Sequence, residues 1–119
     1  MLEINGTELD FDLFDADTAE VYEIAYSEAQ DIIAELQKSD KMSIAFRRGC
    51  AAVKKVFDTI FGEGVGDEVC GEKDNFRICV EAFQELTDEV IRQKKELGTM
   101  SSAAISKYQG NRAERRAKK

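Results

Sequence analysis

Four aspartates near the N-terminus, in the segment DFDLFDAD, have the residue type and spacing to hold a hard cation. They are Asp10, Asp12, Asp15 and Asp17, and clustered carboxylate oxygens are the ligands that Mg²⁺ and Ca²⁺ prefer. The segment lacks the glycine and the terminal glutamate of a calcium-binding loop. Alternation places the first two on the solvent side of a strand, and the other two stand where a helix begins. The sequence therefore favours surface and helix-capping roles over a metal site.

The cysteines and the lack of histidine limit the chemistry further. The chain contains Cys50, Cys70 and Cys79 and no histidine, so a nucleophile would lack its usual base. No two cysteines form a Cys-x-x-Cys pair, which favours reduced thiols over a disulfide framework. Cys50 and Cys79 fall on apolar helix faces, whereas Cys70 falls in a loop and is expected to be the accessible thiol. A three-thiolate metal site is the weaker alternative. We therefore expect no enzyme activity and no cofactor.

A glycine cluster, GEGVG at residues 62–66, invites comparison with phosphate-binding loops. The spacing Gly-x-Gly-x-x-Gly is absent, and no Gly-Lys-Ser/Thr follows. Glu63, Asp67 and Glu68 would also repel a phosphate. The cluster is thus expected to end a helix and form a loop.

The first element expected to position these residues is a β-hairpin. Asn5-Gly6 favours a two-residue type I′ turn between LEI and TELDFDLF, the strands expected at residues 2–4 and 7–14. Alternation on both sides of the turn gives one apolar face, made of Leu2, Ile4, Leu9, Phe11 and Leu13. Because two strands alone are marginally stable, this face is expected to pack on helices.

Three amphipathic helices should follow, because apolar residues recur at spacings of three and four. They are expected to begin at residue 15 or 17, 41, and 74 or 75, and to end near residues 38, 61 and 97. The first inward face comprises Tyr22, Ala25, Tyr26, Ala29, Ile32, Ile33 and Leu36. The second comprises Met42, Ala45, Phe46, Cys50, Val53, Phe57 and Ile60, and the third Phe76, Cys79, Val80, Phe83, Leu86, Val90 and Leu97. Residues 67–71 are expected to form a single turn or an ordered loop.

Charge is divided between the two ends of the chain. Residues 1–40 carry twelve acidic residues and one lysine, whereas residues 98–119 carry six basic residues and only Glu114 against them. Gly98 is expected to break the third helix, leaving residues 98–119 as a flexible basic tail with a transient helix at 111–118. The fold expected is thus mainly α (α+β), a hairpin packed on a three-helix bundle within residues 1–97.

The basic tail has three candidate roles. It could bind a protein partner, contact nucleic acid, or only aid solubility; the acidic body would repel a polyanion, which favours a protein partner. Because the two ends of the chain are oppositely charged, head-to-tail contact between copies is also expected. No stretch has the length of apolar residues that a membrane span needs, and MLEINGTELD lacks the features of a signal peptide, so a cytoplasmic location is expected.

Three segments carry a resemblance to a known family. MLEINGTELDFDLFDADTAEVYE, VFDTIFGEGVGDEVCGEKDNF and the ending YQGNRAERRAKK are similar to short proteins from the tail-morphogenesis region of phages and prophages of Gram-positive bacteria. Those proteins are regarded as tail assembly chaperones or proteins similar to them. The most specific pieces are FDLFDADTAE, IFGEG and NRAERRAKK, and the similarity covers nearly the whole chain.

The resemblance implies a non-enzymatic, mostly helical protein of the bacterial host cytoplasm that is absent from the mature virion. Such a protein binds the tape measure protein, keeps its hydrophobic helices soluble and helps recruit tail tube protein. It also implies a longer product made by translational frameshifting in some members. The family has no catalytic motif, so no functional residue is transferred to this sequence.

Partner binding is expected to use apolar surface and the basic tail. The candidate residues are Leu9, Phe11, Leu13, Phe61, Tyr108, Arg112, Arg115 and Arg116. Further spare apolar positions on the helices are Val21, Ile44, Val56, Ile78 and Ile91. The alternative function is a small phage or prophage regulator that binds a host protein or nucleic acid.

Overall fold

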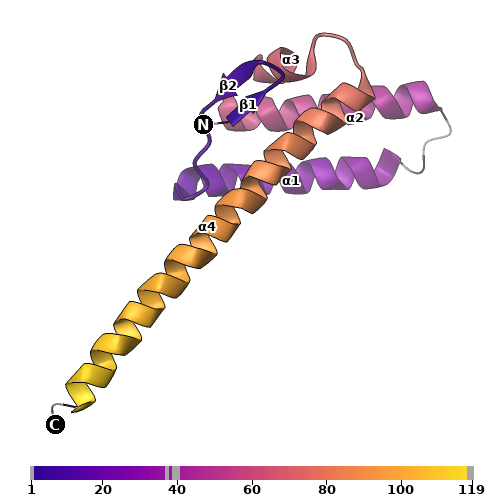
Figure 1. Ribbon diagram of the computed structural model, residues 1–119. Coiled ribbons are helices and arrows are strands. Elements are labelled where there is room, and N and C mark those ends of the chain that lie inside the picture. Colours follow the sequence, from indigo (N-terminus) through magenta and orange to yellow (C-terminus); the bar gives the residue numbers. More distant parts are fainter. Residues whose placement is uncertain (1, 37, 39–40, 118–119) are drawn as a thin grey trace.

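The computed structural model describes residues 2–36, 38 and 41–117, with side chains described as far as residue 102. The protein is mainly helical with an N-terminal hairpin, as predicted (Figure 1). The elements are β1 (Leu2–Ile4), β2 (Thr7–Leu9), α1 (Ala16–Leu36), α2 (Met42–Phe61), α3 (Val65–Cys70) and α4 (Phe76–Ala117).

The hairpin has the Asn5-Gly6 turn that the sequence predicts, but its second strand ends at Leu9 and does not continue through TELDFDLF. Its two strands are antiparallel, with Leu2 opposite Leu9 and Ile4 opposite Thr7. Asn5 and Gly6 have φ values of 49° and 81°, as a type I′ turn requires at both positions. The Asn5 side chain also donates a hydrogen bond of 2.6 Å to the carbonyl oxygen of Val69, which ties the turn to α3.

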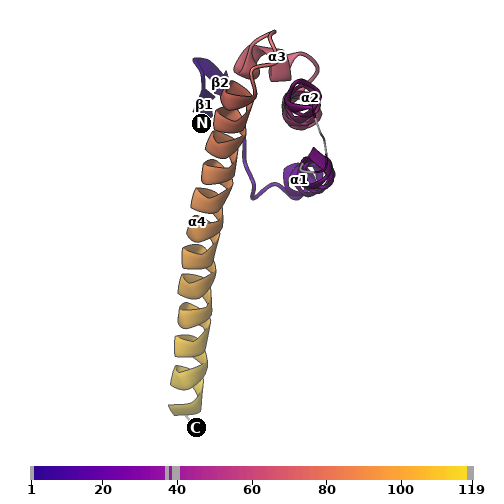
Figure 2. The same cartoon turned by 90° about the vertical axis from the view of Figure 1, so that its right-hand side faces the viewer.

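The helices form two layers. The helices α1 and α2 lie antiparallel, and α4 crosses them diagonally and continues far beyond them (Figure 1). Figure 2 shows α1 and α2 on one side of α4 and the hairpin on the other. The long helix gives the molecule dimensions of 72 × 31 × 20 Å.

The core lies where these elements meet. Phe57 of α2 and Leu86 of α4 are fully buried, and Ile4 of β1 is buried with them. Phe11 contacts two other rings, those of Tyr22 and Phe61, at centroid distances of 6.1 and 5.9 Å. The segment after the hairpin is thereby fixed to both α1 and α2.

Four residues expected to face inward are exposed instead: Met42, Phe46, Val80 and Leu97. The α1–α2 pair extends past the first residue of α4, so α4 does not cover the first turn of α2 (Figure 1). Met42 is therefore 74% exposed and Phe46 42% exposed. Leu97 lies beyond the point where α4 leaves the body, while Val80 lies at the edge of the buried face of α4. The periodicity identified the faces correctly, but not how far each face is covered.

The predicted end of the third helix at Gly98 is wrong, because α4 continues to Ala117. A lone glycine costs a helix only about 1 kcal/mol relative to alanine, and the chain has no proline to end it. The basic tail expected from residue 98 therefore begins inside α4. Its mobility stays a prediction, since residues 118–119 and the side chains after 102 lie outside the described residues.

Candidate partner-binding surfaces

The clustered aspartates support the backbone where the chain enters α1. An Asp15 side-chain oxygen accepts hydrogen bonds from the N–H groups of Asp17 and Thr18 at 2.9 and 3.5 Å. Asp12 accepts the N–H of Phe14 at 3.1 Å. The predicted capping role is confirmed, with Asp15 as the capping residue. Within the described part of the chain, no group of three His, Cys, Asp or Glu side chains is arranged to hold a metal ion.

The three thiols are buried, which corrects the expectation that Cys70 is accessible. Cys70 is the last residue of α3, and it is buried in the core with Cys50 and Cys79. Burial, with added contributions from Cys79, raises the pKa of the Cys50 thiol to about 12. Burial also raises the pKa values of Cys70 and Cys79. Because the three thiols lie within the hydrophobic core cluster, they act as core packing.

The glycine cluster forms the loop and helix cap that the sequence predicts. Gly62 and Gly64 have φ values of 124° and 93°, which favour glycine, and the Gly62 N–H donates to the carbonyl oxygen of Asp58. Gly66 has a different role, because its Cα lies against the α2 backbone. A Cβ there would stand 2.5 Å from the carbonyl oxygen of Lys54. The cluster thus brings α3 into close contact with α2.

Gln93 is the residue that sequence analysis missed. It is the only polar side chain among the buried residues described, and it donates to the carbonyl oxygen of Phe11 at 2.9 Å. Its side-chain oxygen accepts the N–H of Leu13 at 2.6 Å. The available signal was its spacing, since Gln93 follows Val90 by three residues on the inward face of α4.

Apolar residues remain exposed on several helices. Those with large side chains are Phe14, Ile24, Met42, Ile44, Phe46, Ile78, Val80, Ile91, Leu97 and Met100. On α4, two of these residues continue the buried stripe. Leu86 and Val90 are buried, while Leu97 and Met100, further along the same face, are 49% and 54% exposed. Leu97 and Met100 form the uncovered part of the stripe among the side chains described, which end at residue 102.

The predicted partner-binding residues fall into three groups. Leu9 and Phe11 are buried in the core, and so is the spare position Val56. The prediction that these side chains lie on the surface is therefore wrong. Leu13 and Phe61 are partly buried against the same core. The spare positions Ile44, Ile78 and Ile91 are exposed, as expected, while Val21 is partly buried. The last group, Tyr108, Arg112, Arg115 and Arg116, has side chains outside the described ones.

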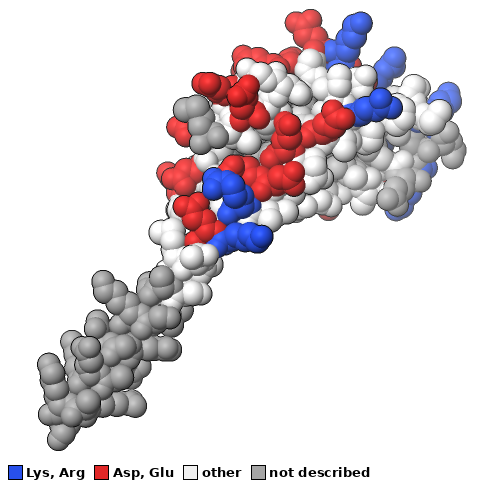
Figure 3. Space-filling view, viewed as in Figure 1, with Lys and Arg blue, Asp and Glu red and all other residues white. Residues whose placement is uncertain are grey.

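Charged side chains are unevenly placed on the surface. On the face seen in Figure 3, acidic side chains gather over the hairpin and the adjoining part of α4. Several basic side chains lie instead toward the end where α2 begins. None of the described helices is both long and apolar enough to cross a membrane.

In a comparison with protein families, the model of a family of unknown function, DUF6673, matches residues 5–119. The chain belongs to this family. The match extends from the hairpin turn through the whole of α4, so the projecting helix lies within the region that defines the family. Comparisons with curated proteins and with solved structures find no match.

Proposed function

We propose that the protein is a non-enzymatic phage tail assembly chaperone of the host cytoplasm. It binds the tape measure protein and assists assembly of the tail tube. The support comes from the three segments similar to such proteins and from the apolar surface that the fold leaves uncovered. Nucleic-acid binding gains no support, because the acidic face formed by the hairpin and α4 would repel a polyanion.

The observation that carries the proposal is the stripe on α4. Within the body this stripe packs into the core at Leu86 and Val90, and it continues past the body as Leu97 and Met100. An apolar stripe along a helix is the surface with which helices pair, because side chains three and four residues apart interdigitate with those of a partner. A tape measure helix laid against this stripe would have its apolar side chains removed from water.

Co-expression with a helical fragment of the tape measure protein tests the proposal. The double variant Leu97→Glu/Met100→Glu places two charges in the stripe and should reduce co-purification at least tenfold, equivalent to about 1.4 kcal/mol. The matched control is Thr99→Glu/Ser102→Glu, which adds the same charges to the opposite face of the same helix. Equal loss of binding in both variants, or none in either, would remove the stripe as the binding surface.

A further inference from the structure

The end of the α1–α2 pair that projects beyond α4 carries an open pocket. Five residues line this pocket, which we call the socket: Phe46, Asp74, Asn75, Phe76 and Arg77. Its floor is aromatic, since the rings of Phe46 and Phe76 stack with centroids 5.3 Å apart. Gly49 lets the Phe76 ring lie directly against α2, because a Cβ at this position would collide with that ring.

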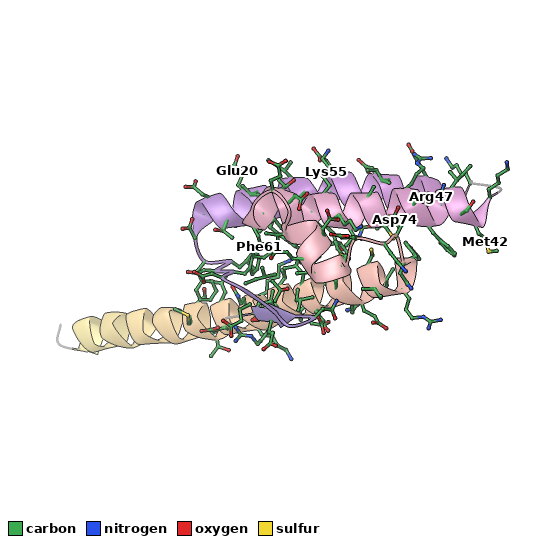
Figure 4. All side chains as sticks on the ribbon, turned by 90° about the horizontal axis from the view of Figure 1, so that it is seen from above. Glu20, Met42, Arg47, Lys55, Phe61 and Asp74 are labelled. Carbon is green, nitrogen blue, oxygen red and sulfur yellow. The ribbon has the colours of Figure 1, made fainter. Side chains whose placement is uncertain are left out.

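The uncompensated charge around the socket is positive. Asp74 shares Lys54 with Asp67, since the Lys54 Nζ lies 3.3 Å from Asp74 and 3.2 Å from Asp67, so these three groups together carry one negative charge against the two positive charges of Arg47 and Arg77. In the described part of the chain, Arg47 and Arg77 have no carboxylate within ion-pair distance. Figure 4 shows Met42, Arg47 and Asp74 toward the same end of the molecule. The socket therefore suits an apolar side chain with carboxylates beside it.

The same chain presents such a side chain at the other end of α1. Phe14 is 41% exposed and is surrounded in the sequence by Asp12, Asp15 and Asp17. None of the three aspartates has a basic partner among the described residues. We call Phe14 and these aspartates the knob. The hydrogen bond from the Phe14 N–H to Asp12 restrains the backbone of the turn, so the main chain loses little conformational freedom on binding.

The knob and the socket of one molecule cannot meet. The knob precedes the first residue of α1, and the socket lies beside the first turns of α2, where α1 ends (Figure 1). The intervening helix has 21 residues, about 31 Å at 1.5 Å per residue. A contact between them therefore joins two copies, and it uses a different surface on each copy.

We infer that copies of this chain associate head to tail, with the knob of one copy in the socket of the next. Each copy keeps one knob and one socket free, so the contact propagates unless the rotation between copies closes a ring. Because five residues line the socket, we expect a small contact area and a weak, concentration-dependent interaction. The inference needs no tape measure protein and stands apart from the proposed function.

Sedimentation velocity of the purified full-length protein, from about 1 μM to about 1 mM, tests the contact. The average sedimentation coefficient should rise with concentration. Raising the salt to about 1 M, where the Debye length falls to about 3 Å, should weaken association several-fold. A protein that remains monomeric over the whole range overturns the inference, and the socket would then suit an acidic segment of another protein.

Two variants separate the knob from the socket. Phe14→Ser and Arg77→Glu should each weaken self-association at least tenfold, and Arg77→Glu is compatible with the first turn of α4, where acidic residues are favourable. Ile24→Ser and Lys94→Glu make comparable changes, an exposed apolar residue to serine and a basic residue to glutamate, at sites outside both surfaces and should associate as the parent does.

Mixing the two variants gives the decisive measurement. Phe14→Ser keeps an intact socket and Arg77→Glu keeps an intact knob, so an equimolar mixture should form dimers and no larger species. If Phe14→Ser fails to fold, as circular dichroism would show, Arg77→Glu against Lys94→Glu still decides the question. Undiminished association of Arg77→Glu would overturn the inference.

Discussion

The side-chain amide of Gln93 donates a hydrogen bond of 2.9 Å to the main-chain carbonyl oxygen of Phe11, 82 residues earlier in the sequence. Its oxygen accepts the N–H of Leu13 at 2.6 Å, so one amide satisfies two backbone groups of an irregular segment. That segment has no strand partner after Leu9, where β2 ends. Gln93 therefore takes the place of a neighbouring strand in fixing residues 11–13 to α4.

We expect Gln93→Leu to lower the free energy of unfolding by about 2 kcal/mol, because the carbonyl of Phe11 and the N–H of Leu13 lose their partners. Urea denaturation followed by circular dichroism measures the change. Gln84→Leu is the control, since Gln84 lies on the exposed side of α4. A loss no larger in Gln93→Leu than in the control would show that the bridge contributes nothing.

The close contact of α3 with α2 makes a second prediction. A methyl group at position 66 would stand 2.5 Å from the Lys54 carbonyl oxygen, which is main chain and cannot rotate away. Gly66→Ala should therefore cost about 1–3 kcal/mol of stability, as overpacking does elsewhere. Gly98→Ala, with no atom within 4 Å of its Cβ, should instead stabilise α4 by up to about 1 kcal/mol. Thermal denaturation of both variants checks the opposite signs.

Much of this fold could be predicted from local patterns. The Asn5-Gly6 turn, the two long amphipathic helices and the glycine cap after Phe61 each depend on a few neighbouring residues. Backbone conformation at such sites is decided by local sterics and periodicity, which a single sequence displays.

The features that could not be predicted depend on where each helix begins and ends relative to its neighbours. Phe46 has the spacing of a core residue, but α4 begins at Phe76, so Phe46 stacks on that one ring and stays 42% exposed. Cys70 is buried because α3 turns inward, and a six-residue helix has too few residues to show a period. The socket brings together α2 and the start of α4, which no local pattern connects.

Stability should fall at alkaline pH because of the buried acids. Burial raises the pKa of Cys50 from 9.0 to about 12, and burial together with Tyr26 raises that of Tyr22 from 10.0 to about 12. The unfolded chain loses these protons at lower pH than the folded chain does, so unfolding releases protons. The stabilisation is complete below pH 9 and is lost as the pH rises toward 12.

Urea denaturation at a series of pH values tests whether stability falls as the pH rises. The free energy of unfolding should decrease from pH 9 upward, with each group contributing at most about 1.4 kcal/mol per pH unit. Cys50→Ala should have a shallower decrease than the parent, because one titrating group has been removed. An unfolding free energy that stays constant to pH 11 would contradict the expectation.

Lys54 joins α2 to the two segments that follow it. Its Nζ lies 3.2 Å from Asp67 of α3 and 3.3 Å from Asp74 ahead of α4, and it donates to the carbonyl oxygen of Glu72. Burial lowers the pKa of Lys54, but the hydrogen bonds with the two carboxylates outweigh this and leave the pKa raised. The side chain of the neighbouring Lys55 is exposed and contacts only Glu28, at 3.4 Å, among the described residues.

Because these adjacent lysines differ mainly in burial and number of partners, the same substitution at both isolates the effect of the Lys54 network. Lys54→Met should lower the free energy of unfolding by about 1 kcal/mol, discounted because both carboxylates remain partly in water. Lys55→Met, which breaks an exposed pair, should change it by less than about 0.5 kcal/mol. Hydrogen exchange should also show faster opening of α3 in Lys54→Met alone, since Lys54 connects α3 to α2. Equal effects of the two substitutions would mean that α3 is held by the packing of Gly66 and Val69 and not by these charges.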